Sequence, residues 1–176
     1  ETLLSGRPTD TPGTCVTCVM EGSRPILAEV QALAAKSGFA AARRNSNGID
    51  YNRAMLLLAV LEKRGGMPIY GCDVYINVVG GLQLDEPAAD LATLLAVASS
   101  YKDVPIGSDL AAIGEIGLSG EVRSVTQLEH RLSETARLGF RRCIIPAHVR
   151  GELHPPAGLE LISVRNIREA ISEALK

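Results

Sequence analysis

Apolar and polar residues alternate along several short stretches of the chain, and this alternation is typical of half-buried β-strands. Residues 15–21 follow it, and so do residues 24–34, where a helix is the alternative. Further strands are predicted at 73–81, 141–146 and 158–164. Over 108–125 the sequence predicts a strand, a Gly-rich turn and a return strand, which together indicate one hairpin.

Other stretches carry the spacing or the terminal residues of helices. Asp50 can cap a helix that runs to about Arg64, with a buried face made of Ala54, Leu57, Leu58 and Leu61. A second helix is predicted from about Pro87 to Tyr101, because Pro suits the first helical position and acidic residues before it suit the positive end of the dipole. Two more are predicted over 127–138 and 166–176. This mixture favours an α/β or α+β fold with a mixed sheet and packed helices.

Two segments lack such patterns. Residues 1–14 are rich in Pro, Gly and Thr and predict a linker or loosely held tail, which leaves 15–176 as a single domain. Residues 37–49 predict an exposed polar loop that carries the adjacent Arg43 and Arg44.

The amino-acid composition indicates which side chains form the core. Apolar residues make up 46% of the 176 positions but aromatic residues only 3%, so the core must be aliphatic. The sequence has no secretory signal and no apolar run near the length that spans a bilayer, so we expect a cytoplasmic protein without a membrane partner. Cys15 and Cys18 form a C-x-x-C pair, but positions i and i+3 of a strand face opposite sides. We therefore predict reduced, structural cysteines and no metal site.

The charge distribution limits contact with nucleic acid to local sites. The net charge is −2, so no global field attracts a polyanion. Residues 73–121 hold one basic and eight acidic residues, whereas 123–150 hold six Arg and two Glu. Contact with DNA would have to be built from local Arg residues. The alternative is that these Arg residues only solvate helix surfaces.

The segment 82–92, "LQLDEPAADLA", predicts a strand end, a tight turn and a helix start, which is a common place to mount a nucleophile. Ala88 and Ala89 occupy this turn and carry no reactive group. Asp85 and Glu86 could form an acid/base pair, although their dipole role is the simpler explanation. Ser99 and Ser100 are candidate nucleophiles on paper, with Lys102 as the only nearby base. No phosphate-binding loop of the G-x-x-x-x-G-K-[ST] type and no G-x-S-x-G motif occurs.

Several of these motifs carry a family resemblance. "DEPAAD" before an apolar helix, then "SDLAAIGEIGLSGEV", "QLEHRL" and "LGFRRCIIP", resemble the proteolytic domain of Lon proteases, which has the ribosomal protein S5 domain 2-like fold. In that family the turn reads D-G-P-S-A-G, its Ser is the nucleophile, and a Lys on a later helix is the base. Ungapped comparison puts Ala88 at the Ser, Arg131 at the Lys and Ile113 at a supporting Thr. Because Arg stays protonated in proteins, the resemblance implies a pseudo-protease.

Longer motifs resemble the C-terminal Lon-like domain of the RadA (Sms) family of bacterial, RecA-related repair ATPases. They are "MEGSRPILAEVQAL", "GIDYNRAMLLLAVLEKRGG" and "VGGLQLDEPAADLA". That resemblance implies a hexameric, DNA-dependent ATPase that processes branched DNA in recombination. ATP, Mg and zinc would bind only in its other domains, so no cofactor is expected here. The expected partners are double-stranded or branched DNA, further copies of the chain, and the RecA-like ATPase domain.

The resemblance and the charge pattern together give a set of candidate DNA-contacting residues: Arg43, Arg44, Arg53, Arg24, Arg123 and Arg131. The alternatives are a solvated loop for Arg43 and Arg44, and structural or subunit ion pairs for the others. The spacing of Arg131 places it on the packed face of its helix, where it is predicted to form a salt bridge with Glu115, Asp85 or Glu86. No aromatic ladder is present for stacking bases, so contact with the backbone of DNA is expected. A pure hexamerisation scaffold is the main alternative function, and a residual Ser peptidase is a further one.

Overall fold

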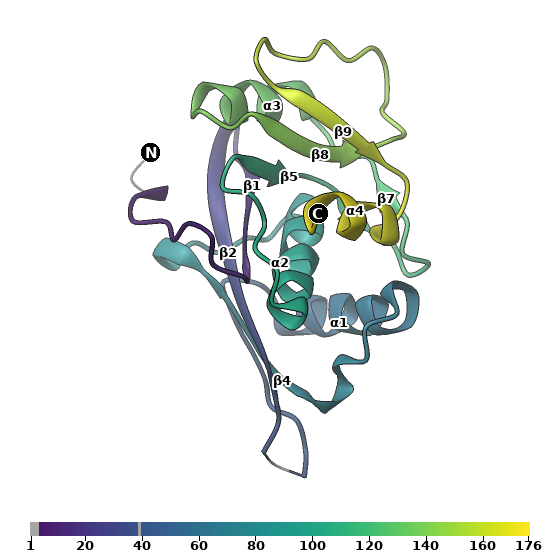
Figure 1. Cartoon of the computed structure of the whole chain (residues 1–176). Helices are drawn as coiled ribbons and strands as arrows, with labels where there is room; N and C mark the ends of the chain where they lie inside the picture. The colour runs from purple at the N-terminus through teal and green to yellow at the C-terminus, as the bar shows by residue number, and fades with distance from the viewer. Residues whose placement is uncertain (1–3, 39) are drawn as a thin grey trace.

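The structure, a computed structural model, describes residues 4–38 and 40–176 and is built on one seven-stranded mixed sheet (Figure 1). The strand order is β3-β4-β2-β1-β5-β8-β9. Strands β1, β2 and β4 pair antiparallel, and the remaining neighbours in the sheet pair parallel. The bounds are β1 (Thr14–Glu21), β2 (Arg24–Lys36), β3 (Arg44–Asn47), β4 (Cys72–Val78), β5 (Leu110–Ala112), β8 (Arg142–Pro146) and β9 (Glu160–Val164). The predicted mixed fold is confirmed, and 24–34 is a strand rather than a helix.

The predicted hairpin is confirmed as a separate antiparallel pair, β6 (Glu115–Ile116) and β7 (Val122–Arg123). The prediction of a loop throughout 37–49 was wrong, because Arg44–Asn47 forms β3 and pairs parallel with β4. Only one edge of β3 is paired, and its side chains are exposed or half-buried. A strand of this kind needs no apolar residues, so hydrophobic alternation could not reveal it. Residue 39 of the predicted loop lies outside the described residues.

The α-helices of the described residues cover the two faces of the sheet unequally (Figure 1). Helices α1 (Tyr51–Gly65), α2 (Asp90–Lys102) and α4 (Ile167–Ala174) pack on one face, and α3 (Leu128–Arg137) packs on the other. Asp50 caps α1 as predicted, since its side chain accepts a hydrogen bond from the Arg53 N–H. Helix α2 starts later than predicted, because Pro87–Ala89 form a 3-10 turn before Asp90. Within the described residues, no helix is both long enough and apolar enough to cross a membrane.

The two sheet faces support two apolar cores. Cys15 packs in the core under α1, α2 and α4, whereas Cys18 packs in the core under α3. The prediction that these thiols face opposite sides is therefore confirmed. Burial raises the pKa of both thiols to about 12, so they remain protonated at neutral pH. All four cysteines are free.

The far ends of β2 and β4 continue past the helices as an arm, which points downwards in Figure 1. There Leu33 lies opposite Tyr75 in the register of β2 and β4, and these side chains are 58% and 38% exposed. One face of the arm is thus left uncovered. We call this surface the open arm face and define it by Leu33 and Tyr75.

Residues 1–3 of the predicted tail lie outside the described residues. Residues 4–13 contact the domain: Gly13 donates its N–H to Ser99 Oγ at 2.9 Å and accepts from the Ala32 N–H at 2.7 Å. The Arg7 guanidinium lies 5.2 Å from the centre of the Phe140 ring. A domain boundary at residue 15 stays a prediction.

Candidate functional site

The turn before α2 places Ala88 in the core beneath α3. The Ala88 side chain is 3% exposed and packs in the same cluster as Ile113 and Leu132. The Ala88 carbonyl accepts from the Gly114 N–H at 3.0 Å, and the Leu91 N–H donates back to the Gly114 carbonyl at 3.1 Å. These bonds hold the turn against the chain leading into β6. Position 88 of this turn therefore holds a buried methyl group.

Arg131 is fully enclosed by hydrogen-bond acceptors. Its side chain is 1% exposed, and both terminal nitrogens bond to the Glu86 carboxylate, with Nη2 at 3.0 Å from Oε2. Nη1 also donates to the Cys18 carbonyl at 3.1 Å, and Nε donates to the Thr126 carbonyl at 2.9 Å. Of the three carboxylates predicted to pair with Arg131, Glu86 is the one that does. A guanidinium held in this way can neither accept a proton nor reach a DNA phosphate.

Glu86 also fixes the neighbouring strand, because its Oε1 accepts from the Met20 N–H of β1 at 2.8 Å. Its carboxylate thus joins β1, the turn and α3. This contact replaces the dipole role expected from the sequence, and it leaves no free acid/base pair with Asp85.

A second ion pair lies on the other side of the turn. Arg53 Nε donates to Asp90 Oδ1 at 3.0 Å, and Arg53 Nη2 contacts Asp90 Oδ2. The Ile116 N–H also donates to Asp90 Oδ2 at 3.0 Å. Burial raises the pKa of the Asp90 carboxyl, and the hydrogen bonds from Arg53 and Ile116 oppose that rise. The hydrogen bond to Asp90 in turn raises the pKa of Arg53.

These two pairs account for two of the three acidic residues in the turn, Glu86 and Asp90. Compared with the Lon pattern D-G-P-S-A-G, Glu86 and Asp90 stand where that pattern has its two Gly residues. Each introduced carboxylate is matched by an Arg from another element, Arg131 of α3 or Arg53 of α1. The turn is therefore fixed on both sides by ion pairs. Sequence reasoning missed the role of Asp90, because its partner Arg53 lies on a different helix, α1, 37 residues away in the sequence.

The remaining predicted Arg residues lie at separate edges of the fold. Arg24 opens β2 at the β1–β2 turn and is exposed, and Arg43 is exposed just before β3, where its N–H donates to Asp73 Oδ1 at 2.7 Å. Arg123 of β7 is exposed and pairs with Glu121 at 3.0 Å. Arg44 is half-buried, and its Nη2 donates to the Ile69 carbonyl at 3.0 Å. The structure does not bring these side chains into one patch.

The serines considered as nucleophiles have structural partners. Ser99 Oγ donates to the Val104 carbonyl and accepts from Gly13, and Ser100 Oγ accepts from the Ala34 N–H at 2.9 Å. Both hydroxyls therefore tie the end of α2 to neighbouring segments. Neither forms a hydrogen bond with Lys102 in the described part of the chain.

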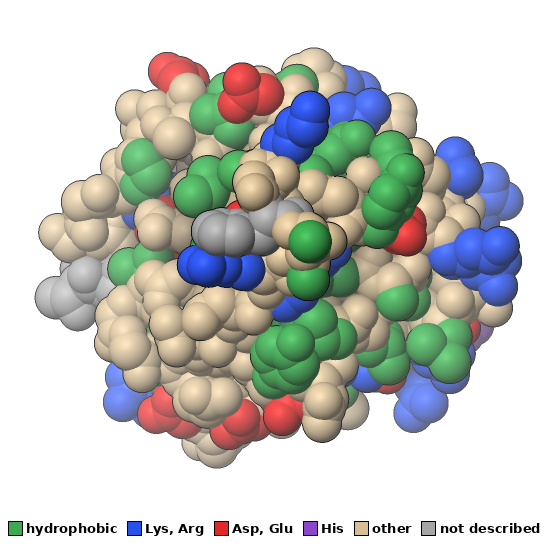
Figure 2. Space-filling model, turned by 90° about the horizontal axis from the view of Figure 1, so that it is seen from below, with side chains coloured by type: hydrophobic (Ala, Val, Ile, Leu, Met, Phe, Trp, Pro, Cys, Tyr) green, Lys and Arg blue, Asp and Glu red, His purple; other side chains and the backbone are tan. Residues whose placement is uncertain are grey.

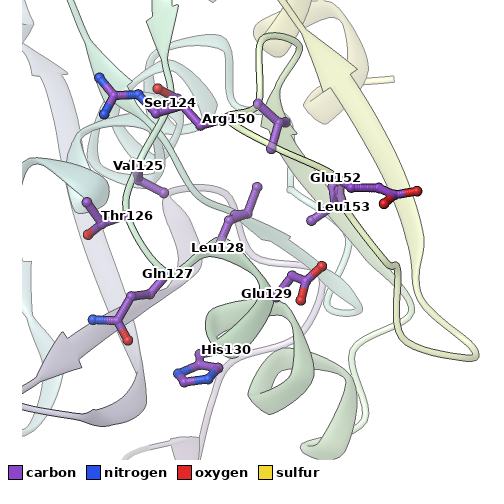
Figure 3. Close-up of a pocket in the computed structure, with 11 residues that line it drawn as sticks. Ser124, Val125, Thr126, Gln127, Leu128, Glu129, His130, Arg150, Glu152 and Leu153 are labelled. Atoms are coloured by element: carbon purple, nitrogen blue, oxygen red, sulfur yellow. The ribbon is translucent and has the colours of Figure 1, made fainter.

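A groove of about 540 Å³ lies beside the start of α3 (Figure 3). It is bounded by the loop at 124–127 and by the segment at 149–153. Val125, Leu128 and Leu153 supply apolar lining, and Glu129 and His130 stand near its edge. No hydrogen bond joins Ser124 or Thr126 to a histidine among the described residues. The groove therefore contains no assembled nucleophile and base.

Comparison with known proteins agrees with the resemblance seen in the motifs. Residues 66–176 match the family model of the Lon protease (S16) C-terminal proteolytic domain. The chain is 47% identical to the DNA repair protein RadA of Bacillus subtilis over 99% of this chain and 38% of that protein. It is 45% identical to RadA of Listeria monocytogenes over 99% of this chain and 38% of that protein, and 43% identical to RadA of Synechocystis over 98% and 34%. The chain thus spans little more than a third of the length of these relatives.

Proposed function

This chain belongs to the family of the Lon protease (S16) C-terminal proteolytic domain, and we propose that it is a non-catalytic member that binds DNA and supports assembly within a RadA-type repair protein. The main support for a non-catalytic domain is the Arg131–Glu86 ion pair. It occupies the position of the Lon base and leaves that position permanently charged. The buried Ala88 supplies no nucleophile beside it.

Two kinds of observation support the proposal that the domain binds DNA. The relatives are named DNA repair proteins and match nearly the whole chain. Arg24 and Arg43 are exposed on separate turns, and Arg123 keeps most of its side chain in solvent despite its pairing with Glu121. Surface pairs of this kind are weak, so Arg123 can exchange its carboxylate for a phosphate. The contact would be with the DNA backbone and independent of base sequence.

The parent protein would act in the bacterial cytoplasm as a DNA-dependent ATPase. In this proposal the RecA-like ATPase domain, outside this chain, binds ATP and Mg and drives movement on branched DNA. The present domain supplies DNA contacts and a surface for ring assembly. The preferred assembly is a hexamer, as the family resemblance implies.

Titration of a labelled duplex with the chain at several salt concentrations tests the DNA-binding part. We expect binding that weakens steeply as salt rises, because Lys and Arg displace counterions from phosphates. Arg24→Ala/Arg43→Ala should weaken binding without a change in fold. Arg137→Ala is the matched control, since Arg137 is exposed but its guanidinium is held by Glu134 on the same helix. Absence of duplex binding by the unaltered chain at low salt would contradict the proposal.

A scaffold without DNA contact is the second candidate, and the open arm face favours it. Leu33 and Tyr75 form an exposed apolar cross-strand pair beside β3, whose outer edge is unpaired. Exposed apolar surface and an open strand edge both promote association between copies. Light scattering of the chain and of Leu33→Asp separates the two functions. If the chain assembles, Leu33→Asp disrupts assembly and neither protein binds duplex, the scaffold function replaces the DNA-binding one.

A further inference from the structure

A basic corner forms where α1 ends and α4 begins, at the right of Figure 1. A pocket of about 310 Å³ there is lined by Lys63, Arg64, Ser119, Gly120, Asn166, Ile167 and Arg168. Three of these side chains are cationic and none is a carboxylate. Seen from below, Lys and Arg side chains stand along the right edge of the molecule, the side on which α1 ends (Figure 2). We call the three cations Lys63, Arg64 and Arg168 the basic corner.

The cations of the basic corner have no acidic partner within the described residues. All three residues are exposed, and none takes part in an ion pair there. Arg64 makes only a long hydrogen bond, from Nε to the Leu118 carbonyl at 3.4 Å. Nearby Arg165, in contrast, is paired with Glu169 at 3.0 Å. The corner therefore concentrates positive charge that the chain itself does not offset.

Helix dipoles explain only part of this cluster. Lys63 and Arg64 lie in the last turn of α1, where cations favourably meet the negative end of the helix. Arg168 starts in the first turn of α4, but its guanidinium lies against Gly66 at the C-terminal end of α1, so its charge also meets the negative end of that helix. The three charges also repel one another across a shared pocket. A bound anion would offset this repulsion.

The backbone of the corner is also suited to an anion. The Ile167 N–H donates to the Gly120 carbonyl at 2.9 Å, and the Glu169 N–H donates to the Asn166 side chain at 3.0 Å. Between them, the Arg168 N–H has no acceptor in the part of the chain that the structure describes. Gly120 has a φ of +82°, and a Cβ there would lie 2.9 Å from the Arg64 Cβ, so a larger residue would crowd the pocket.

We propose that the basic corner binds a phosphate of the DNA backbone. This inference rests on the proposed DNA-binding function and adds a contact point that the candidate Arg residues did not include. An Arg fork and a Lys ammonium together provide the directed and the point-charge contacts that phosphates take in proteins. A phosphodiester needs no base recognition, which agrees with a corner that has no aromatic side chain in its lining.

Duplex titration by fluorescence anisotropy, at four or more salt concentrations, tests the inference with Lys63→Ala/Arg168→Ala. Each lost phosphate contact should reduce the slope of log K against log salt by about 0.9. We therefore expect the double variant to bind about tenfold more weakly at low salt and to show a slope smaller by roughly 1 to 2. Arg165→Ala is the matched control, because it removes a neighbouring charge that Glu169 already pairs. It should bind within about twofold of the unaltered chain.

Urea unfolding of each variant excludes loss of fold as the cause. If the alanine variant unfolds early, Lys63→Gln/Arg168→Gln keeps the side-chain length and repeats the test. The inference is overturned if the unaltered chain binds duplex and the double variant binds with the same affinity and slope. That result would leave the proposed DNA-binding function intact, whereas failure of the unaltered chain to bind would remove both.

Two further readouts separate other sources of the anion. If pyrophosphate raises the Tm of the unaltered chain but not of the double variant, while duplex binding is equal, the corner binds a free phosphate and the DNA assignment is overturned. If light scattering shows that the double variant loses self-association while duplex binding is equal, a carboxylate from a second copy occupies the corner. That outcome would also overturn the inference.

Discussion

Arg131→Met is the sharpest test of the structural role assigned to the altered dyad position. The substitution removes the guanidinium that donates to the Cys18 and Thr126 carbonyls, and it leaves the Glu86 carboxylate with the Met20 N–H but without its cationic partner. Met retains an unbranched apolar side chain, so most of the effect comes from these lost polar partners and not from an empty cavity.

The magnitude follows from the surroundings of the pair. Breaking a buried ion pair by removing one partner costs about 3–5 kcal/mol, because the other charge is left without compensation. Glu86 keeps 27% of its side chain exposed, so water partly solvates the orphaned carboxylate and the lower end applies. We expect a loss of about 3 kcal/mol in the free energy of unfolding. In a domain of this size that loss corresponds to a fall in Tm of roughly 6–12 °C.

Urea unfolding followed by circular dichroism measures this loss, and a double-mutant cycle with Glu86→Gln isolates the pair. Since Glu86→Gln/Arg131→Met carries no orphaned charge, it should be more stable than Arg131→Met by about 1–2 kcal/mol. Arg137→Met on the same helix is the control, because its exposed pair with Glu134 should contribute less than about 1 kcal/mol. A loss below about 1 kcal/mol in Arg131→Met, with no coupling in the cycle, would refute the reasoning.

Three other predictions follow from the same contacts. Ala88→Ser/Arg131→Lys should show no peptidase activity in a fluorogenic peptide assay, because Glu86 would hold the introduced amine protonated; hydrolysis above the rate of Ala88→Ser alone would contradict this. Iodoacetamide should modify Cys72 in the folded chain and all four cysteines in urea, as mass spectrometry can show, because Cys15, Cys18 and Cys143 are buried and burial raises their pKa. The Arg142 guanidinium holds the pKa of the Asp109 carboxyl below its ordinary value of 3.8, so this pair stabilises the fold above that pH and ceases to do so as the pH falls through the lowered pKa. The acid limb of the stability curve should therefore be shallower in Asp109→Asn, and an identical limb would contradict the assignment.

The sequence determined the local structure well where apolar spacing was strong. The strands at 15–21 and 24–34, the helix capped by Asp50 and the helix at 127–138 all formed, and their ends shifted by no more than two residues. The residue types at positions 88 and 131, Ala and Arg, were also readable, and the proposal of a non-catalytic domain depends on them. An Ala methyl group cannot attack a substrate and an Arg guanidinium cannot accept a proton, whatever fold surrounds them.

Tertiary structure decided which charges meet. Glu86 was one of three carboxylates open to Arg131, and only the packing of α3 on β1 and the turn selected it. Arg53 was grouped with DNA contacts, but α1 places its guanidinium on Asp90. In both cases the partners are 37 to 45 residues apart, and a periodic pattern carries no information about contacts at that range.

The same limit explains β3 and the basic corner. The β3 segment is polar because an edge strand buries few side chains. Its hydrogen bonds to β4 form because the fold places the two strands side by side, and apolar side chains are not needed for them. Lys63 and Arg168 belong to helices that are separate in sequence and become neighbours only when α1 and α4 pack side by side. The sequence by itself determined most of the helices and strands and the unreactive side chain at position 88, because these follow from local geometry and residue chemistry. The fold alone decided which charged groups are neutralised inside the protein and which remain for a partner, because burial and distance are properties of the packed chain.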